Sequence, residues 1–271
     1  MFRVRSVAVI ASVVGLLCAN AVQASQDSRW FGSFAGTLRL PNSNQGEDQD
    51  NAFGEVLGKV GFALSETQKG RLAVFAHTIL STDSSGASFN NVNKAGVGVE
   101  YRWRVSKPLT LTFSARYDWS ERRPTGLARE GARFQINAFY FRYWHGGGKE
   151  TRLGLPVHST VFKAYGSLYA PGSMAPGDDN VVLSYGAEVS ERLDLPNVKW
   201  RVALFADLVG SWDADKNSFN NKIIPALGIR LERPLPGGSF FVGARLRADW
   251  RYVNRTLDIE PGLSLGWFRT F

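Results

Sequence analysis

The strongest constraint on the fold of this chain is a two-residue alternation of apolar and polar side chains that recurs from about residue 29 onwards. Successive side chains of a strand point to opposite faces, so such an alternation predicts a strand with one apolar face. The clearest run covers residues 109–120. Its apolar members are Leu109, Leu111, Phe113, Ala115, Tyr117 and Trp119, and between them stand Thr110, Thr112, Ser114, Arg116, Asp118 and Ser120.

We count about twelve such runs and no stretch with a useful helical periodicity. They cover residues 29–40, 53–64, 71–82, 94–105, 109–120, 132–144, part of 151–169, 181–193, 198–212, 222–232, 239–252 and 258–271. The seventh run is poorly phased and contains Pro156, which cannot donate to a strand ladder, so we expect a bulge or a late start there. We see no internal repeat beyond this succession of hairpins.

The connections between the runs alternate in kind. Those after even-numbered runs are short or rich in turn residues, at 65–70, 106–108, 145–149, 194–197 and 234–238. Most of those after odd-numbered runs are longer and more polar, at 41–51, 83–91, 121–131, 171–180 and 213–221. The short connection 253–257 departs from this pattern. Membrane β-barrels show this asymmetry between their two ends, and an even strand count places both chain termini at the same end.

The last run ends on an aromatic residue. Leu263, Leu265, Trp267 and the terminal Phe271 share one face of the expected strand. This pattern resembles the insertion signature of bacterial outer-membrane β-barrels, although Arg269 stands where such proteins usually carry an apolar residue. The resemblance implies an all-β fold, a single antiparallel transmembrane barrel of about twelve strands over residues 25–271. It also implies outer-membrane lipid and the barrel-assembly machinery as partners.

The tryptophans support a membrane location. On the expected topology they fall near strand ends and never at mid-strand, as in the aromatic belts at membrane interfaces. The expected belt comprises Trp30, Trp103, Trp119, Trp144, Trp200, Trp212, Trp250 and Trp267. Sheet edges exposed to lipid would leave backbone groups unsatisfied, so the first run must pair with the last.

The N-terminus has the composition of a secretory signal peptide. Arg3 and Arg5 precede an apolar run that is too short to span a membrane, and small residues lead to Ala24. We therefore predict a signal peptide over residues 1–24 and a location in the outer membrane of a Gram-negative-type bacterium. Cys18, the only cysteine, lies within this segment, so no disulfide is expected in the mature chain.

If the apolar faces meet lipid, the charges face the lumen. The expected lumen-lining set is Arg102, Arg116, Asp118, Glu188, Arg230, Arg245, Arg247, Asp249 and Arg251. The formal net charge is +8, or +6 without Arg3 and Arg5. An excess of lumenal arginine attracts anions and binds carboxylate or phosphate, which favours a narrow channel for small anionic solutes. In size and arginine content the chain is similar to small outer-membrane channels for acidic oligosaccharides.

The same residues allow other interpretations. The inward charges could pair with one another and fill the lumen, or the barrel could export a polysaccharide with a separate periplasmic partner. A surface role could use the acidic loop 42–50. A membrane-embedded lipid hydrolase or deacylase would need a serine and a histidine side chain adjacent in space. We expect no catalytic residue, because His77 has no obvious nucleophile, His145 is expected in a turn, and His158 and Ser159 should face opposite ways. We expect no metal site, no cofactor and no nucleic-acid partner.

Overall fold

The computed structural model describes residues 29–40, 52–84, 90–152, 154–170, 180–216 and 220–271, so the predicted signal peptide and the acidic loop 42–50 lie outside the described residues. The described residues contain twelve strands. Their bounds are β1 (Trp30–Leu40), β2 (Phe53–Glu66), β3 (Gly70–Asp83), β4 (Val92–Arg104), β5 (Leu109–Arg122), β6 (Leu127–His145), β7 (Val157–Ala170), β8 (Val182–Asp194), β9 (Arg201–Asp213), β10 (Lys222–Leu235), β11 (Gly238–Arg251) and β12 (Thr256–Thr270).

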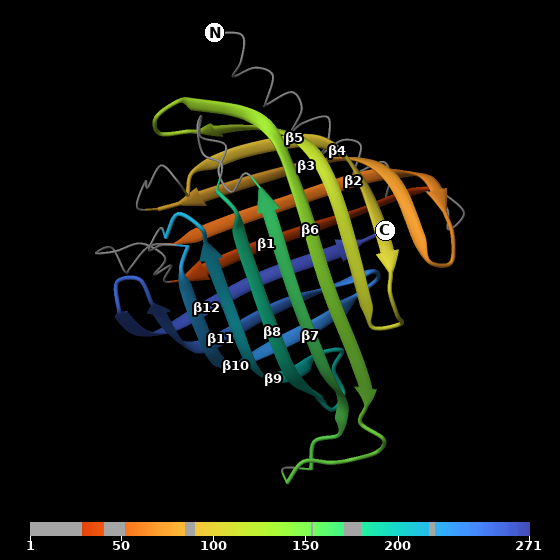
Figure 1. Cartoon of the computed structure of the whole chain (residues 1–271). Helices are drawn as coiled ribbons and strands as arrows, with labels where there is room; N and C mark the ends of the chain where they lie inside the picture. The colour runs from red at the N-terminus through yellow and green to blue at the C-terminus, as the bar shows by residue number, and fades with distance from the viewer. Residues whose placement is uncertain (1–28, 41–51, 85–89, 153, 171–179, 217–219) are drawn as a thin grey trace.

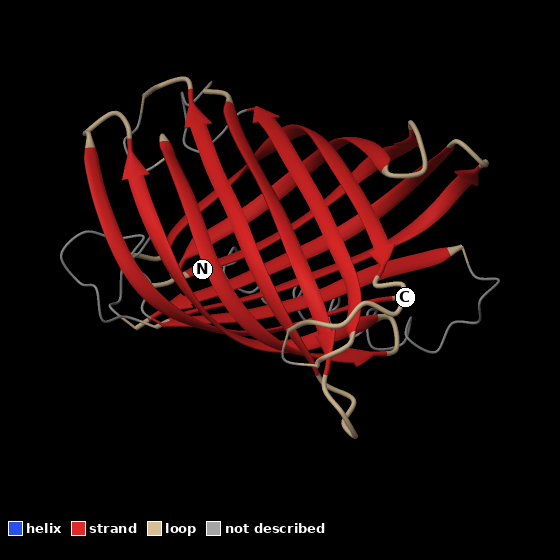
Figure 2. Cartoon of the chain, turned by 90° about the horizontal axis from the view of Figure 1, so that it is seen from below, coloured by secondary structure: helices blue, strands red, loops and turns tan. Residues whose placement is uncertain are grey.

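The strands form one closed antiparallel barrel in chain order (Figures 1 and 2). Each strand pairs with its neighbour in the chain, and β1 closes the barrel against β12 from Ser33–Thr270 to Leu40–Leu263. Phe271 extends this seam through two backbone hydrogen bonds of 3.1 Å with Gly32. The predicted fold class and the expected pairing of first and last strands are thereby confirmed.

Two connections differ from expectation. The polar stretch 121–131 was expected to be a loop, but β5 and β6 remain paired up to Arg122 and Leu127, with a turn at residues 123–126. The connection after β6 was expected to be short, yet it runs from Gly146 to Pro156 and contains an isolated bridge between Glu150 and Pro156. Figure 1 shows the β6–β7 hairpin extending beyond the rest of the barrel. A polar stretch thus indicates where a strand leaves the apolar region of the membrane. The backbone hydrogen bonding between two strands can continue beyond that point.

The seventh strand shows both of the features expected around Pro156. It starts late, at Val157, and the register with β8 shifts between Val157 and Ser159. Pro156 lies just before the strand, where its missing N–H removes no ladder hydrogen bond.

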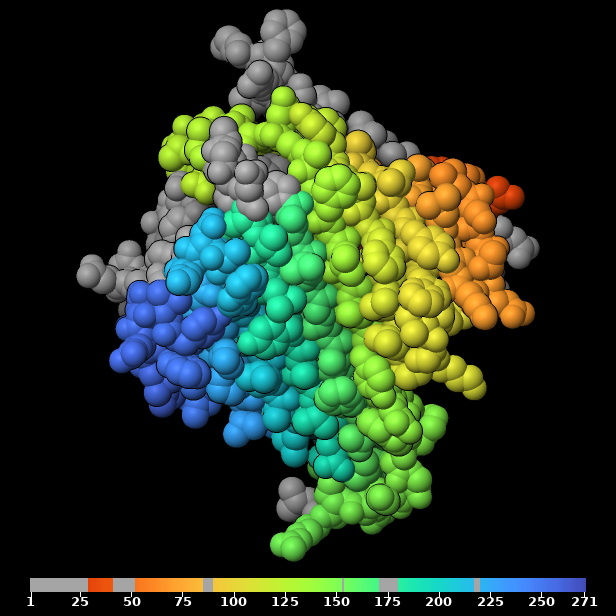
Figure 3. Space-filling model, viewed as in Figure 1, coloured from red at the N-terminus to blue at the C-terminus, as the bar shows by residue number. Residues whose placement is uncertain are grey.

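The barrel is apolar outside and polar inside. Large apolar side chains stand exposed on the outer wall, among them Leu227, Phe134, Ile259 and Leu263 at 58–67% exposure (Figure 3 shows one side of this wall). Charged residues such as Asp118, Asp249 and Arg247 are instead buried, at 0, 2 and 4%. A closed sheet with this distribution satisfies its backbone internally and presents apolar surface to lipid. The chain thus has the closure and the apolar outer wall of a transmembrane β-barrel.

Every tryptophan lies within three residues of a strand end. One group sits at the barrel end that holds the chain termini, and it consists of Trp30, Trp103, Trp144, Trp200 and Trp267. The other group sits at the opposite end and consists of Trp119, Trp212 and Trp250. Among the described residues no helix has the length and hydropathy of a membrane span.

Candidate lumen site

The ladder register carries the inward parity across the whole wall. Lys59 is opposite His77, His77 is opposite Gly96, and Gly96 is opposite Asp118, which gives one inward row over β2 to β5. The nine residues expected to line the lumen all lie on this inward parity of their strands. The structure does not leave them as isolated charges, because most of them contact an opposite charge.

Asp118 on β5 is the centre of the first cluster. Its carboxylate is fully buried and lies 2.9 Å from His77 Nε2, 3.0 Å from Lys94 Nζ and 3.0 Å from Arg116 Nε. Arg133 Nε on β6 is 3.9 Å away. One carboxylate therefore serves four basic side chains from β3 to β6, and this cluster has an excess of positive charge whenever the three non-histidine cations are ionised.

Glu188 on β8 is the centre of the second cluster. Arg230 on β10 holds it with two parallel N–H···O bonds of 2.6 and 3.0 Å, and Lys163 on β7 adds a contact of 2.8 Å. Arg230 Nε also contacts Glu232 Oε1 at 2.6 Å, and the other oxygen of Glu232 lies 3.0 Å from Arg192 Nε. Forked Arg–carboxylate bonds restrict both side chains, so this cluster is a rigid part of the wall.

The four charges expected on β11 pair with residues of other strands or with each other. Arg245 lies 4.0 Å from Asp207 on β9, and Arg247 lies 3.1 Å from Glu260 on β12. Arg251 contacts Asp249 on its own strand at 3.6 Å. The buried Arg247 and Asp249 lie towards the barrel end opposite the termini.

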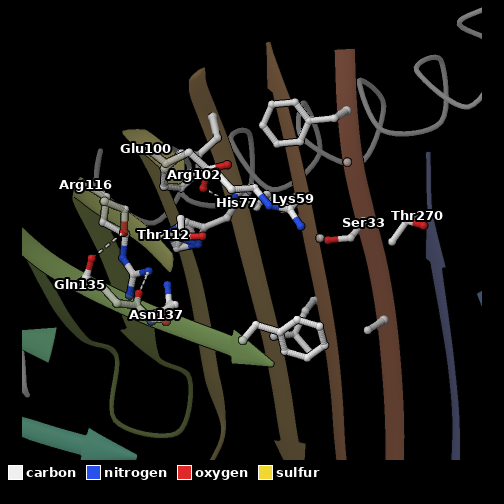
Figure 4. A pocket seen from close by; sticks show the side chains of 18 of the residues that line it. Ser33, Lys59, His77, Glu100, Arg102, Thr112, Arg116, Gln135, Asn137 and Thr270 are labelled. Atoms are coloured by element: carbon white, nitrogen blue, oxygen red, sulfur yellow. Dashed lines mark hydrogen bonds and ion pairs between the residues drawn. The ribbon is translucent and has the colours of Figure 1, made fainter. Parts of the chain in front are cut away.

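A cavity of about 600 Å³ occupies the lumen on the β1–β6 side, towards the end that holds the termini (Figure 4). Its wall carries four cations and one carboxylate. These are Lys59, Arg71, Arg102 and Arg116 together with Glu100. Glu100 pairs with Lys59 and lies 3.7 Å from Arg71, whereas Arg102 makes no ion pair with any described residue. The wall of the cavity therefore has a net positive charge.

Uncharged hydrogen-bonding groups cover one side of this cavity. Thr110, Thr112 and Ser114 come from β5, and Gln135 and Asn137 come from β6. The two amides form a connected series with Arg116, because Arg116 Nη1 donates to Gln135 Oε1 at 2.5 Å and Gln135 Nε2 donates to Asn137 Oδ1 at 2.7 Å. Figure 4 shows Arg116, Gln135 and Asn137 side by side on this wall.

Aromatic rings on the inward face lie beneath several cations. Arg71 stands 3.5 Å from the centre of the Phe31 ring, and Lys59 stands 4.3 Å from that of Phe75. On the other half of the barrel, Arg230 lies 4.7 Å from the centre of the Phe205 ring. Such cation–π contacts hold the charged groups against the wall and restrict their motion.

Several inward charges were not singled out from the sequence. They are Arg71, Lys94, Arg133, Lys163 and Glu260. The same parity rule would have placed Arg71, Lys94 and Arg133, which stand near the first residues of their expected runs. The parity of Lys163 could not be assigned because the alternation of β7 is irregular around its bulge. Glu260 was not assigned because it stands close to the turn that precedes β12.

The histidines lie in distinct places. His77 belongs to the Asp118 cluster, and His145 ends β6 with its ring 4.8 Å from that of Tyr143. His158 stands at the β7 bulge, with Nδ1 3.0 Å from Asp194 Oδ2 and Nε2 3.2 Å from the Tyr143 hydroxyl. Ser159 Oγ makes no hydrogen bond among the described residues, and those residues hold no cluster of His, Cys, Asp or Glu suited to a metal ion.

No protein-family model and no curated protein matches the chain. Among solved structures, the chain is similar to the β-domain of the Bordetella autotransporter BrkA, with 13% identity, a TM-score of 0.44, and coverage of 90% of this chain and 100% of that one. LpxR from Salmonella typhimurium gives 11% identity and a TM-score of 0.43 over 88% and 100% of the two chains. The KdgM porin gives 7% and 0.39 over 88% and 99%. Likeness at this level carries no information on activity or ligand.

Proposed function

We propose that this barrel is a narrow outer-membrane channel for small anionic solutes, with acidic oligosaccharides as the favoured class. The observation that carries the proposal is the lumenal cavity, with its four cations against one carboxylate. A positive wall in a low-dielectric barrel concentrates anions and repels cations.

The uncharged part of the cavity wall suits a solute that also carries hydroxyl groups. Threonine and serine hydroxyls and the two amides can each donate to and accept from a sugar hydroxyl. Phe31, Phe75 and Phe139 add apolar ring surface to the same cavity. Charge, hydroxyl partners and ring faces within one cavity are the groups that an acidic saccharide requires.

Conductance in planar lipid bilayers tests the proposal. We expect discrete channels whose reversal potential in a KCl gradient shows anion selectivity. An oligo-uronic acid added to one side should block them at lower concentration than a neutral malto-oligosaccharide of the same length. Cation selectivity, or equal block by the two saccharides, would contradict the proposal.

The second candidate is a barrel whose lumen is closed and structural. The buried clusters around Asp118, Glu188 and Arg247 favour it, because ion pairs fill much of the interior. This candidate predicts no conductance from correctly folded protein. It would then leave transport to a partner or a surface role to the loops.

A further inference from the structure

The two halves of the chain share sequence at a constant separation. Of the 21 residues from 71 to 91, ten are identical to those found 130 positions later, from 201 to 221. The identical residues, by their first-half numbers, are Arg71, Ala73, Phe75, Ala76, Ser81, Asp83, Ser88, Phe89, Asn90 and Asn91. The segment 36–43 matches 166–173 at the same separation, with Gly, Leu, Pro and Ser identical. This corrects the expectation that the chain contains no internal repeat.

The ladder register repeats as well, and sequence alone could not show this. Lys59 faces His77 in the first half, and Glu188 faces Asp207 in the second. Each strand of β1–β6 thus matches one of β7–β12 at a shift of 129 or 130 residues. The match includes the seam: Phe139–Tyr165 between β6 and β7 corresponds to Phe268–Ala35 between β12 and β1. The barrel therefore has a twofold repeat in its hydrogen-bond register.

The repeat extends to side-chain contacts at the barrel end opposite the termini. The Asp83 N–H donates to Asn91 Oδ1 at 3.1 Å, and Asn91 Nδ2 donates to the Asp83 carbonyl at 3.4 Å. Asp213 and Asn221 make the same two bonds at 3.2 and 3.4 Å. In both halves the preceding asparagine also donates to the aspartate Oδ2. One motif thus closes the β3–β4 and the β9–β10 hairpins.

The two halves also end in similar sequences. The chain terminates in Trp267-Phe-Arg-Thr-Phe271, and β6 contains Tyr140-Phe-Arg-Tyr-Trp144 just before its last residue. Both segments place aromatic, Arg and aromatic side chains on the outward parity and Phe on the inward parity. The copy on β6 lies two residues further along its strand than the register alone would place it. The exception noted at Arg269 therefore recurs at Arg142.

We propose that the barrel consists of two six-stranded repeats, β1–β6 and β7–β12, and that Tyr140–Trp144 is a second recognition sequence for the barrel-assembly machinery. The β6–β7 pair is then equivalent to the β12–β1 seam, and either pair can be the last to close. In the native chain order the copy on β6 is followed by β7 and is not used. When it is placed at the end of the chain, it should direct assembly.

Circular permutation of the mature chain tests this inference. One permutant joins Phe271 to Arg29 through a flexible linker and opens the connection 146–156. Its chain carries a signal peptide at the N-terminus and ends at Trp144. A matched permutant opens the connection 195–200 at the same barrel end and ends at Leu195, with no aromatic residue over the last residues of β8. Both should refold in detergent, because both keep every strand and neighbour. Only the permutant ending at Trp144 should appear in outer membranes as a folded, heat-modifiable band, several-fold more abundant than the other.

Single substitutions separate recognition from an ordinary interfacial role. Trp144→Ser should abolish cellular assembly of the permutant that ends there and leave assembly of the native order unchanged, whereas Phe271→Ser should do the reverse. A tryptophan needed only as part of the aromatic belt would cause the same loss in both orders. Any of three results would overturn the proposal: the same loss in both chain orders, equal assembly of the two permutants, or failure of the permutant ending at Trp144 to refold in detergent.

Discussion

Lys59 and Glu188 occupy the same register position in the two halves of the barrel, yet they carry opposite charges. Lys59 on β2 pairs with Glu100 on β4, and Glu188 on β8 pairs with Arg230 on β10. Glu100 and Arg230 are also equivalent, so the whole ion pair is reversed between the halves. In each half the cation of the pair lies over a phenylalanine ring, and the two phenylalanines, Phe75 and Phe205, are equivalent in the repeat. The repeat therefore maintains paired charge at this level of the wall while the sign of each member changes.

This reversal predicts that the first pair tolerates exchange of its members. Lys59→Glu alone should lower the free energy of unfolding by about 3 kcal/mol, because it leaves two carboxylates facing each other where a pair was partly buried. Lys59→Glu combined with Glu100→Lys should recover most of that loss. Urea unfolding of the protein in lipid vesicles measures both. An exchange variant as unstable as the single variant would show that the position accepts one polarity only.

Arg102 offers the most direct test of anion selectivity. It lines the cavity and makes no ion pair with the described residues, so Arg102→Glu changes the field of the lumen without breaking a pair. We expect the reversal potential in a KCl gradient to move towards that of potassium, and block by an oligo-uronic acid to weaken. Lys149→Glu in the exposed β6–β7 connection is the matched control and should leave both unchanged. Equal effects of the two variants would place the selectivity elsewhere.

Reversing the charge of Arg247 on β11 would not test anion selectivity. Arg247 is 4% exposed and bound to Glu260, so reversing its charge should unfold the protein before it alters permeation. Breaking such a buried pair typically costs about 3–5 kcal/mol. We therefore expect Arg247→Glu to reduce the yield of folded barrel, measured by heat-modifiable mobility, and Arg102→Glu to leave that yield intact.

Glycines on the wall differ in the space they leave. A Cβ at Gly228 would stand 2.4 Å from Phe205 Cζ and 2.6 Å from the Ala244 carbonyl oxygen, so Gly228→Ala forces ring and backbone apart. We expect a loss of about 1–3 kcal/mol in the free energy of unfolding. At Gly166 the nearest atom is 3.8 Å away, and Gly166→Ala should be neutral or slightly stabilising. Urea midpoints of the two variants compare them directly, and equal midpoints would contradict the steric argument.

The asparagines that close the two hairpins should contribute similarly to stability. Asn91→Ala and Asn221→Ala each leave a buried aspartate N–H without its acceptor, at a cost of about 1–3 kcal/mol. Asn254→Ala, in the exposed turn between β11 and β12, should change stability little. Thermal unfolding in detergent measures all three. A large effect at only one of the two equivalent asparagines would argue that the motif has diverged in role.

The residues alone determined the strands and their faces. Period-two alternation depends only on local geometry, so the runs around Leu109–Ser120 and Phe240–Arg251 could be assigned to strands with a lipid face and an inward face without knowing their partners. The even strand count and the need to satisfy edge backbone groups then required β1 to meet β12. The strand faces could be read because they depend on a residue and its immediate neighbours, and the closure because a sheet in lipid can have no open edge.

Only the tertiary structure decided which charges meet. Glu188 and Arg230 are 42 positions apart and come together across β9, and one carboxylate, Asp118, holds side chains from four strands. Long arginine and lysine side chains reach over neighbouring strands, so their pairing depends on the register of the closed sheet, which no local pattern encodes. The same register revealed the twofold repeat. It also explains why the cavity lies on one side of the lumen. The first half has the small side chains of Ala35 and Thr112 at the positions where the second half has the large rings of Tyr165 and Phe241.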